Sequence, residues 1–281
     1  EMPDAHVYLD GDVEMLSRHG SFVGQHVCTP LQGVAVHINA FNFPVWGMLE
    51  KLAPTLLAGM PAIVKPATVT GYLTEAAFRM IIESGLLPDG AVQLVSGRLG
   101  PLLDMLGPQD AVSFTGSAVT GVMLRGTPNL LERSVRFSAE QDSLNATILG
   151  PDVMAGDPEF DLFIKEAAGE ITAKAGQKCT AVRRILVPEA LRQPVAEALR
   201  AALGDVAVGD PRLKEVGMGA LASGGQKQDV LAKCEMFKGE ARCIIGGEAP
   251  RLTGEDLASG AFVAPTIFDC ADPDGATHLH E

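Results

Sequence analysis

Short apolar runs alternate with amphipathic segments through the first half of the chain. The apolar runs have the length and β-branched content of buried strands, and they lie at 33–38, 62–65, 92–95 and 111–114. Between and after these runs, apolar residues recur at helical spacing, at 45–58, 71–84, 99–106 and from Ser117 to about Arg125. Strands that alternate with helices at this spacing predict a parallel sheet covered on both faces.

A second α/β unit begins near residue 146. The pattern there predicts strands at 145–149 and 183–187 and helices at 159–174 and 189–203. The segment 244–281 is rich in Gly, Pro and Asp and predicts loops with short strands. We therefore expect an α/β protein with two domains, 1–145 and 146–281. Within the first domain, alternation at 21–27 suggests a hairpin or an extended arm ahead of the first buried strand.

Composition narrows the class of protein. The chain has 281 residues, of which 47% are hydrophobic, with a formal net charge of −13. This content supports a folded core, and the negative charge disfavours non-specific binding to nucleic acid or to anionic membranes. No apolar stretch is long enough to span a membrane. We expect a cytoplasmic protein with neither nucleic acid nor membrane as a partner.

The five cysteines form no CxxC pair and are widely spaced, so we expect reduced thiols and neither a disulfide framework nor a metal site. Four of them are interpreted as packing residues, namely Cys28, Cys234, Cys243 and Cys270. His37, on an apolar strand, is interpreted as a core histidine rather than a catalyst.

Cys179 is the strongest candidate for chemistry. It lies in the run Ala-Gly-Gln-Lys-Cys-Thr-Ala (175–181), directly after a helical pattern. A lone carboxylate, Glu140, follows the apolar residues around Phe137. A thiol with a remote carboxylate suggests covalent catalysis with a separate base. The alternative is a buried structural cysteine, the more common fate of a free Cys.

Three further segments carry candidate binding groups. Phe114 to Gly121 predicts a strand, a small-residue turn and a helix whose free amides could face a phosphate, although the segment is not GxGxxG and could be a turn without a ligand. Lys65 ends another strand and could bind a ribose or a phosphate, or be a surface lysine. Asn42 could be a turn former or could donate to an oxyanion.

Five motifs in order resemble the aldehyde dehydrogenase superfamily over Gly33 to Glu281. They are Asn-Phe-Pro (42–44), Val-Lys-Pro-Ala (64–67), Phe-Thr-Gly-Ser (114–117), Gly-Gln-Lys-Cys (176–179) and Pro-Thr-Ile-Phe (265–268). The segments 37–44 and 139–145 are similar to the branch that oxidises CoA-linked semialdehydes in aerobic aromatic-acid degradation.

The resemblance implies an overall architecture. A Rossmann-type parallel-sheet cofactor domain would precede an α/β catalytic domain, with the chain truncated at both ends relative to the family. Residues 13–32 would form an oligomerisation hairpin, giving a homodimer or a larger homo-oligomer. A fused or partner hydratase is a further possibility.

The resemblance also implies roles for individual residues. Cys179 would be the nucleophile that forms a thiohemiacetal and then a thioester, Asn42 and the Cys179 backbone amide would hold the oxyanion, and Glu140 would activate water. The cofactor-binding residues would be Lys65, Ala67, Thr68, Thr115, Gly116, Ser117, Gly121 and Glu281.

Departures from the family pattern refine the expected reaction. Thr68 stands where members that prefer NAD often have a Glu, and a small hydroxyl leaves room for a 2′-phosphate, so we expect NADP, with NAD possible. Phe41 replaces the usual Trp, and Gln141-Asp142-Ser143 replace Leu-Gly-Gly after the base, which suggests altered packing there. We expect NADP-dependent oxidation of a CoA-thioester semialdehyde to an acid. The alternatives are an acylating dehydrogenase, against which Glu140 argues, and an inert nucleotide-binding module.

Overall fold

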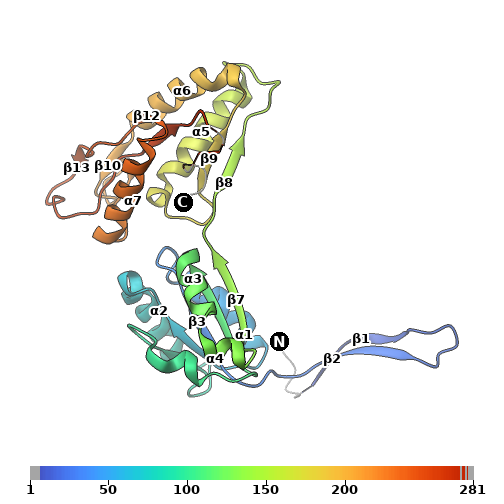
Figure 1. Ribbon diagram of the computed structural model, residues 1–281. Coiled ribbons are helices and arrows are strands. Elements are labelled where there is room, and N and C mark those ends of the chain that lie inside the picture. The colour runs from blue at the N-terminus through green and yellow to red at the C-terminus, as the bar shows by residue number, and fades with distance from the viewer. Residues whose placement is uncertain (1–6, 273, 276, 278–281) are drawn as a thin grey trace. The chain divides into compact units, whose positions relative to one another are not determined.

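The structure is a computed structural model that describes residues 7–272, 274–275 and 277. The chain divides into two compact units, Glu1–Gln141 and Asp142–Glu281 (Figure 1). The division falls close to the expected boundary at 145/146.

A five-stranded parallel sheet in the order β5-β4-β3-β6-β7 forms the centre of the first unit. The strands are β3 (Ala35–Ile38), β4 (Ala62–Lys65), β5 (Val92–Leu94), β6 (Ala111–Gly116) and β7 (Arg136–Gln141). The first four confirm the predicted apolar runs. The sequence pattern does not predict β7, because this edge strand is mostly exposed and only Phe137 and Gln141 are half-buried.

The sheet of the first unit carries apolar side chains on both faces. One hydrophobic cluster joins Val36, Ile38, Val112 and Phe114 to the residues that follow β5, and another joins Val64 and Val92 to Met48 and Leu52. Burial of each such side chain contributes about 1.5–3 kcal/mol. The helical segments are α1 (Trp46–Leu57), α2 (Gly71–Glu83), α3 (Ala118–Arg125), α4 (Pro128–Glu132) and the 3-10 segments η1 (Thr68–Thr70) and η2 (Gly100–Met105).

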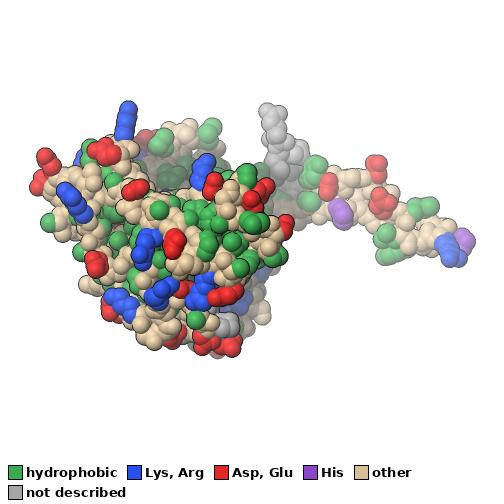
Figure 2. All heavy atoms as spheres, turned by 90° about the horizontal axis from the view of Figure 1, so that it is seen from above, with side chains coloured by type: hydrophobic (Ala, Val, Ile, Leu, Met, Phe, Trp, Pro, Cys, Tyr) green, Lys and Arg blue, Asp and Glu red, His purple; other side chains and the backbone are tan. Residues whose placement is uncertain are grey.

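An antiparallel hairpin precedes this sheet and protrudes from the first unit (Figure 2). It consists of β1 (Tyr8–Met15) and β2 (Val23–Cys28), and it confirms the alternation predicted at 21–27. Apart from the half-buried Gly24, both strands are exposed along their whole length, including Leu9, Val13 and Val27. Cys28 is also exposed, so its interpretation as a packing residue is wrong.

The second unit distributes its strands over three small sheets instead of one. They are the parallel pair β8 (Asn145–Ile148) and β9 (Val182–Leu186), the parallel trio β11 (Val216–Met218), β10 (Ala207–Gly209) and β13 (Leu252–Thr253), and the antiparallel pair β12 (Arg242–Ile245) and β14 (Ile267–Asp269). The helical segments are α5 (Pro158–Thr172), η3 (Ala173–Gly176), η4 (Glu189–Leu191), α6 (Arg192–Gly204) and α7 (Gly224–Phe237). The main core cluster packs α5 against α6 through Phe160, Ile164, Val195 and Leu199. None of the described helices is long and apolar enough to cross a membrane.

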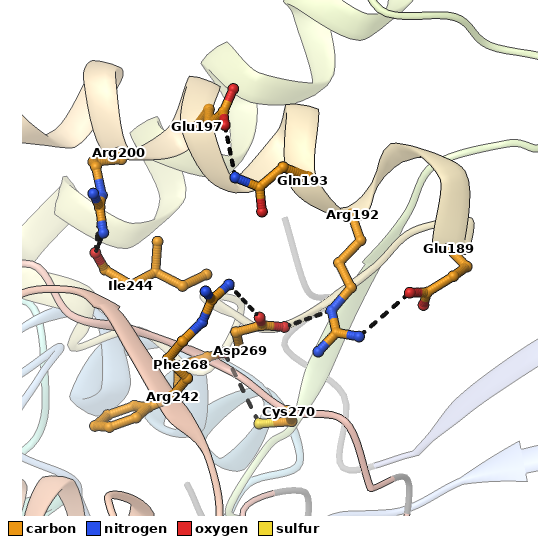
Figure 3. Close-up of polar contacts among 10 residues, drawn as sticks. All are labelled: Glu189, Arg192, Gln193, Glu197, Arg200, Arg242, Ile244, Phe268, Asp269 and Cys270. Carbon is orange, nitrogen blue, oxygen red and sulfur yellow. Dashed lines mark hydrogen bonds and ion pairs between the residues drawn. The ribbon is translucent and has the colours of Figure 1, made fainter.

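Asp269 ties the strand β14 to its neighbours (Figure 3). Its carboxylate accepts hydrogen bonds from Arg192 Nε of α6 at 2.8 Å and from Arg242 Nη2 of β12 at 2.9 Å. The hydrogen bond from Arg192 is the largest of the effects that hold the pKa of Asp269 below its usual value. Arg200 donates twice to the Ile244 carbonyl, at 2.7 and 3.1 Å, and so joins α6 directly to β12.

Candidate active site

The loop that carries Asn42 follows β3 and is held from two sides. Asn39 N donates to Lys65 O at 3.0 Å, which continues the pairing of β3 with β4 beyond the strand. Two hydroxyls from the segment after Lys65 donate to the loop carbonyls: Thr70 Oγ1 to Phe41 O at 2.9 Å and Thr74 Oγ1 to Pro44 O at 3.0 Å. These bonds fix the backbone on both sides of the half-buried Asn42.

The turn between β6 and α3 ends at a capped helix N-terminus. Ser117 is the N-cap of α3, and its side chain accepts from Thr120 N at 3.3 Å, as predicted. Ser117 is exposed, so the first amides of α3 are close to the surface. A Cβ at Gly116 would lie 2.6 Å from the Phe114 ring, and a Cβ at Gly121 would overlap the Gln141 side chain. Packing alone therefore accounts for both glycines.

Lys65 lies at the carboxyl end of β4, at the same edge of the sheet as the turn after β6, because the strands are parallel. It is half-buried, and burial lowers the pKa of its ammonium group. Ala67 is extended and directly precedes η1, and Thr68 at the start of η1 is exposed. Glu281, the remaining predicted cofactor residue, lies outside the described residues.

Glu140 lies on β7 opposite Thr115 of β6 and borders an open pocket of about 370 Å³. Lys51 of α1 lies on the same pocket, and its Nζ donates to Thr115 Oγ1 at 2.7 Å. The Lys51 side chain is only 9% exposed. The helical pattern at 45–58 places Lys51 on α1, but no local signal in the sequence marks it, because its partner is 64 residues away.

His37 borders the same pocket from β3. It is 1% exposed, and its Nε2 lies 3.0 Å from Thr55 Oγ1. Burial, together with the nearby positive charge of Lys51, lowers the pKa of His37 to about 4. The imidazole is therefore neutral near pH 7, which agrees with its interpretation as a core histidine.

The loop that carries Cys179 begins with a left-handed turn. The predicted helix at 159–174 ends at Thr172, because Lys174 and Ala175 both have φ of 53° and Gly176 has φ of 72°. Such φ values cost a non-glycine residue roughly 1–2 kcal/mol, and strain of this kind concentrates at functional sites. Cys179 follows three residues later and is exposed, so it is not the buried structural cysteine of the alternative interpretation.

Side chains hold this strained loop. Gln177 Nε2 donates to Lys174 O at 2.9 Å, and Gln177 Oε1 accepts from Ala222 N at 2.9 Å. Arg183 Nη2 donates to Gly176 O at 2.7 Å. Lys178 Nζ pairs with Glu170 Oε1 of α5 at 2.9 Å. Lys174, Gly176, Gln177 and Lys178 therefore each take part in a hydrogen bond or an ion pair.

The Cys179 carbonyl accepts two further side-chain hydrogen bonds. Asn145 Nδ2, at the start of β8, donates to Cys179 O at 2.6 Å and to Ala181 O at 3.2 Å. Ser143 Oγ also donates to Cys179 O. No local signal in the sequence links either residue to Cys179, because Asn145 and Ser143 lie 34 and 36 residues before it.

The predicted site residues are thus divided between the units. Lys65, Gly116 and Ser117 share one edge of the sheet in the first unit, which also contains Asn42 and Glu140, whereas Cys179 belongs to the second unit. Among the described residues, no cluster of three or more His, Cys, Asp or Glu side chains is arranged to hold a metal ion. The chemistry available is that of a thiol, an amide, a carboxylate and a helix N-terminus.

Curated relatives match most of this chain. It is 44% identical over 273 residues to 3,4-dehydroadipyl-CoA semialdehyde dehydrogenase of Aromatoleum evansii, and the aligned region covers 97% of this chain and 53% of the relative. It is 32% identical over 241 residues to alpha-ketoglutaric semialdehyde dehydrogenase of Bacillus subtilis, covering 84% of this chain and 47% of the relative. The chain therefore spans about half the length of these relatives.

Solved structures share the fold. A betaine aldehyde dehydrogenase from Staphylococcus aureus, solved with NAD+, gives a TM-score of 0.83 at 24% identity, over 99% of this chain and 53% of the other. An aldehyde dehydrogenase from Pseudomonas syringae, solved with NAD+ and octanal, gives a TM-score of 0.74 at 25% identity, over 89% of this chain and 50% of the other.

A family match covers nearly the whole chain. The sequence profile described as "Aldehyde dehydrogenase family" matches residues 8–281. Together with the 44% identity to a curated relative, this match confirms the resemblance seen in the five motifs. The chain belongs to the aldehyde dehydrogenase family.

Proposed function

We propose that the protein oxidises an aldehyde, a CoA-linked semialdehyde, to a carboxylic acid through a covalent intermediate on Cys179, with NADP as the hydride acceptor. The observation that carries the proposal is the exposed thiol of Cys179 on a strained loop held by side-chain ties. The substrate class is supported by the 44% identity to a relative named as a dehydroadipyl-CoA semialdehyde dehydrogenase.

The first step would be attack of the Cys179 thiolate on the aldehyde carbon, forming a carbon–sulfur bond and an alkoxide. The Asn42 side-chain amide and the Cys179 backbone N–H would donate to that alkoxide. Within the described residues the Cys179 N–H makes no hydrogen bond, so it is available for this role. The hydrogen bonds from Ser143 and Asn145 use the Cys179 carbonyl and not its N–H.

Bound NADP would supply the acceptor for the hydride that leaves the thiohemiacetal carbon, and Cys179 would then carry a thioester. Glu140 would take a proton from water, whose oxygen attacks the thioester carbon and releases the acid and the thiol. The position of Glu140 on an open pocket that also contains Lys51 and Thr115 is consistent with a base that meets solvent.

The cofactor assignment rests on the edge of the first unit's sheet. The capped N-terminus of α3 suits a pyrophosphate, Lys65 suits a ribose or a phosphate, and the exposed Thr68 leaves room for a 2′-phosphate. Solved members of the family were crystallised with NAD+. The ratio of kcat/KM for NADP and NAD decides the preference. A higher kcat/KM for NAD would overturn it, and Thr68→Glu should shift the ratio toward NAD.

The test of the reaction uses the full-length protein and a panel of free and CoA-linked semialdehydes, with NADPH production as the readout. A CoA-linked substrate should give the highest kcat/KM. Glu140→Gln should give one burst of NADPH and then stall as the acyl-enzyme accumulates. Turnover that requires added free CoA would instead identify an acylating dehydrogenase. No NADPH from any aldehyde would identify an inert nucleotide-binding module.

We also propose that the exposed hairpin of β1 and β2 joins copies of this chain in the full-length protein. The support is the row of exposed apolar side chains on both strands. Light scattering of the full-length protein with residues 8–28 replaced by a short Gly-Ser linker should show a smaller assembly than the wild type. An unchanged mass would exclude the hairpin as the contact.

A further inference from the structure

We propose that Ser143 and Asn145 are positioning residues that aim the Cys179 thiol by fixing the peptide that follows it. The inference rests on the proposed role of Cys179 as nucleophile and deepens it, because it names the groups that set the orientation of the thiol. Neither residue would touch the substrate.

The hydrogen bonds converge on one peptide. Cys179 O accepts from Asn145 Nδ2 at 2.6 Å and from Ser143 Oγ, so both acceptor positions of this carbonyl are used. Asn145 Nδ2 also lies 3.4 Å from Ser143 Oγ, which links the two donors to each other. A carbonyl held by two donors cannot rotate about the Cα–C bond of Cys179 without losing both.

Asn145 is itself anchored. Asn145 begins β8 and pairs with Val182 at the start of β9, the strand that immediately follows the Cys179 loop. The second acceptor of Asn145 Nδ2 is Ala181 O at 3.2 Å, and Ala181 is completely buried. The Asn145 amide thus binds the carbonyls of both Cys179 and Ala181, and its own backbone is held in β8. A shift of the Cys179 loop would therefore break these hydrogen bonds.

The loop needs such an anchor because its first half is strained. Lys174 and Ala175 occupy left-handed backbone conformations, and relief of that strain would pull the following residues away from their observed path. An attacking atom must lie within about 3–3.5 Å of its target with its orbitals aligned, and a displacement of about 1 Å can cost on the order of 100-fold in rate. The hydrogen bonds from Ser143 and Asn145 to the Cys179 carbonyl oppose such a displacement.

Position 143 offers a direct test of the proposal. The Ser143 hydroxyl adds a second hydrogen bond to the Cys179 carbonyl beside that of Asn145. Ser143→Ala removes this hydrogen bond, and Ser143→Thr keeps a hydroxyl that can make it.

The experiment compares Asn145→Ala, Ser143→Ala and Ser143→Thr in the full-length protein. Two quantities are measured: the rate constant of the NADPH burst in the first turnover, and the second-order rate constant for alkylation of Cys179 by iodoacetamide between pH 6 and 9. We expect Asn145→Ala to slow the burst about 10- to 100-fold and Ser143→Ala about 3- to 10-fold. KM for NADP should stay within about twofold, and Ser143→Thr should restore the burst because it keeps the hydroxyl.

A matched control removes a side-chain amide elsewhere in the second unit. Gln193 Nε2 donates to Glu197 on the surface of α6, so Gln193→Ala should leave both rate constants unchanged. The Tm of each variant is measured in parallel. If Asn145→Ala does not fold, Ser143→Ala and Ser143→Thr decide the question.

Two results would overturn the inference. One is a burst and an alkylation profile within twofold of the wild type in folded Ser143→Ala and Asn145→Ala. The other is a slowing in Ser143→Thr as large as in Ser143→Ala. The alkylation rate needs no turnover, so it tests the positioning role even if no aldehyde is oxidised. Loss of the proposed function itself would appear instead as wild-type protein that produces no NADPH.

Discussion

Two loops carry the candidate chemistry, and they are held in different ways. Residues 39–45 contain no positive-φ residue, and hydroxyls of Thr70 and Thr74 hold their carbonyls. Residues 173–181 contain Lys174 and Ala175 in left-handed conformations. An amide, a guanidinium and one hydroxyl donate to carbonyls of this loop. The amide-bearing loop follows a relaxed path, whereas the thiol-bearing loop is kept in a costly conformation.

The difference suggests different sensitivities. The relaxed loop should lose function only when the Asn42 amide is removed or when the Thr70 and Thr74 hydroxyls that hold its carbonyls are removed. A strained loop should also lose function when the side chains that hydrogen-bond to it are removed. The left-handed conformation costs roughly 1–2 kcal/mol per residue, so the loop gains free energy when it leaves that conformation.

Removal of the thiol should have the largest effect. Cys179→Ala leaves no nucleophile, so we expect kcat to fall by about 10⁴-fold or more while binding of NADP is retained. The measurement is steady-state NADPH production together with NADP affinity from fluorescence titration. Cys28→Ala, at the other exposed cysteine, is the matched control and should keep full kcat.

Removal of the amide from the relaxed loop should come next. Asn42→Ala deletes one oxyanion donor, and we expect kcat to fall about 10²- to 10³-fold with little change in KM. Gln93→Ala, at an exposed amide on β5, is the control. A rise in KM with unchanged kcat would show that Asn42 binds the substrate equally in the ground and transition states, contrary to the proposed role.

Low pH should lower the stability of the first unit, because the buried His37 side chain must become protonated. The pKa of His37 is about 4 in the folded chain and about 6.5 when unfolded, so the unfolded chain binds more protons between these values. The free energy of unfolding should therefore fall by about 3 kcal/mol as the pH is lowered from 7 through 4. Lys51, Glu50 and Glu140 border the same pocket and contribute their own charges.

Denaturant unfolding of the wild type and His37→Gln at pH 7, 5.5 and 4 measures this contribution. The variant should show a smaller loss of stability on acidification, because its side chain does not titrate. Equal pH dependence in the two proteins would contradict the assignment to His37.

Loss of a hydroxyl hydrogen bond to the relaxed loop should have a smaller effect on the free energy of unfolding. Thr74 is completely buried, so Thr74→Val leaves the Pro44 carbonyl without its donor and should cost about 1–2 kcal/mol in the free energy of unfolding. Thr74→Ser keeps the hydroxyl and should cost less. Ser84→Ala, which removes an exposed hydroxyl-to-carbonyl bond at the other end of α2, is the control.

Relief of strain in the thiol-bearing loop should have the smallest effect. Ala175→Gly removes the Cβ from a left-handed residue but adds backbone entropy to the unfolded chain, so we expect a gain of only about 0.5–1 kcal/mol. Thermal unfolding measures it. A loss of stability would show that Ala175 is not strained.

The sequence pattern predicts what depends on local residues. The sequence pattern predicts β3, β4, β5 and β6 because each is a short apolar run with at least one buried β-branched residue. The exposed strand β7 and the helix α7, whose one fully buried residue is Cys234, offer no such pattern. Motifs also named the candidate thiol, amide and carboxylate, and their catalytic roles stay predictions.

What the sequence could not predict depends on contacts between distant residues. The end of α5 at Thr172 has no local signal, since Lys174 and Ala175 are good helix formers, and tertiary ties impose the left-handed turn. The contacts of Thr74 with Pro44 and of Asn145 with Cys179 span 30 and 34 residues. Such pairs become visible only when the strands and helices are placed.

The hairpin of β1 and β2 has a consequence for solution experiments. It is a separate two-stranded sheet, and two strands without a covering layer are marginally stable in water. Its amides should therefore take up deuterium far sooner than those of the buried strand β3. Slow uptake across 8–28 in the full-length protein would locate a covered surface directly, without any substitution in the chain.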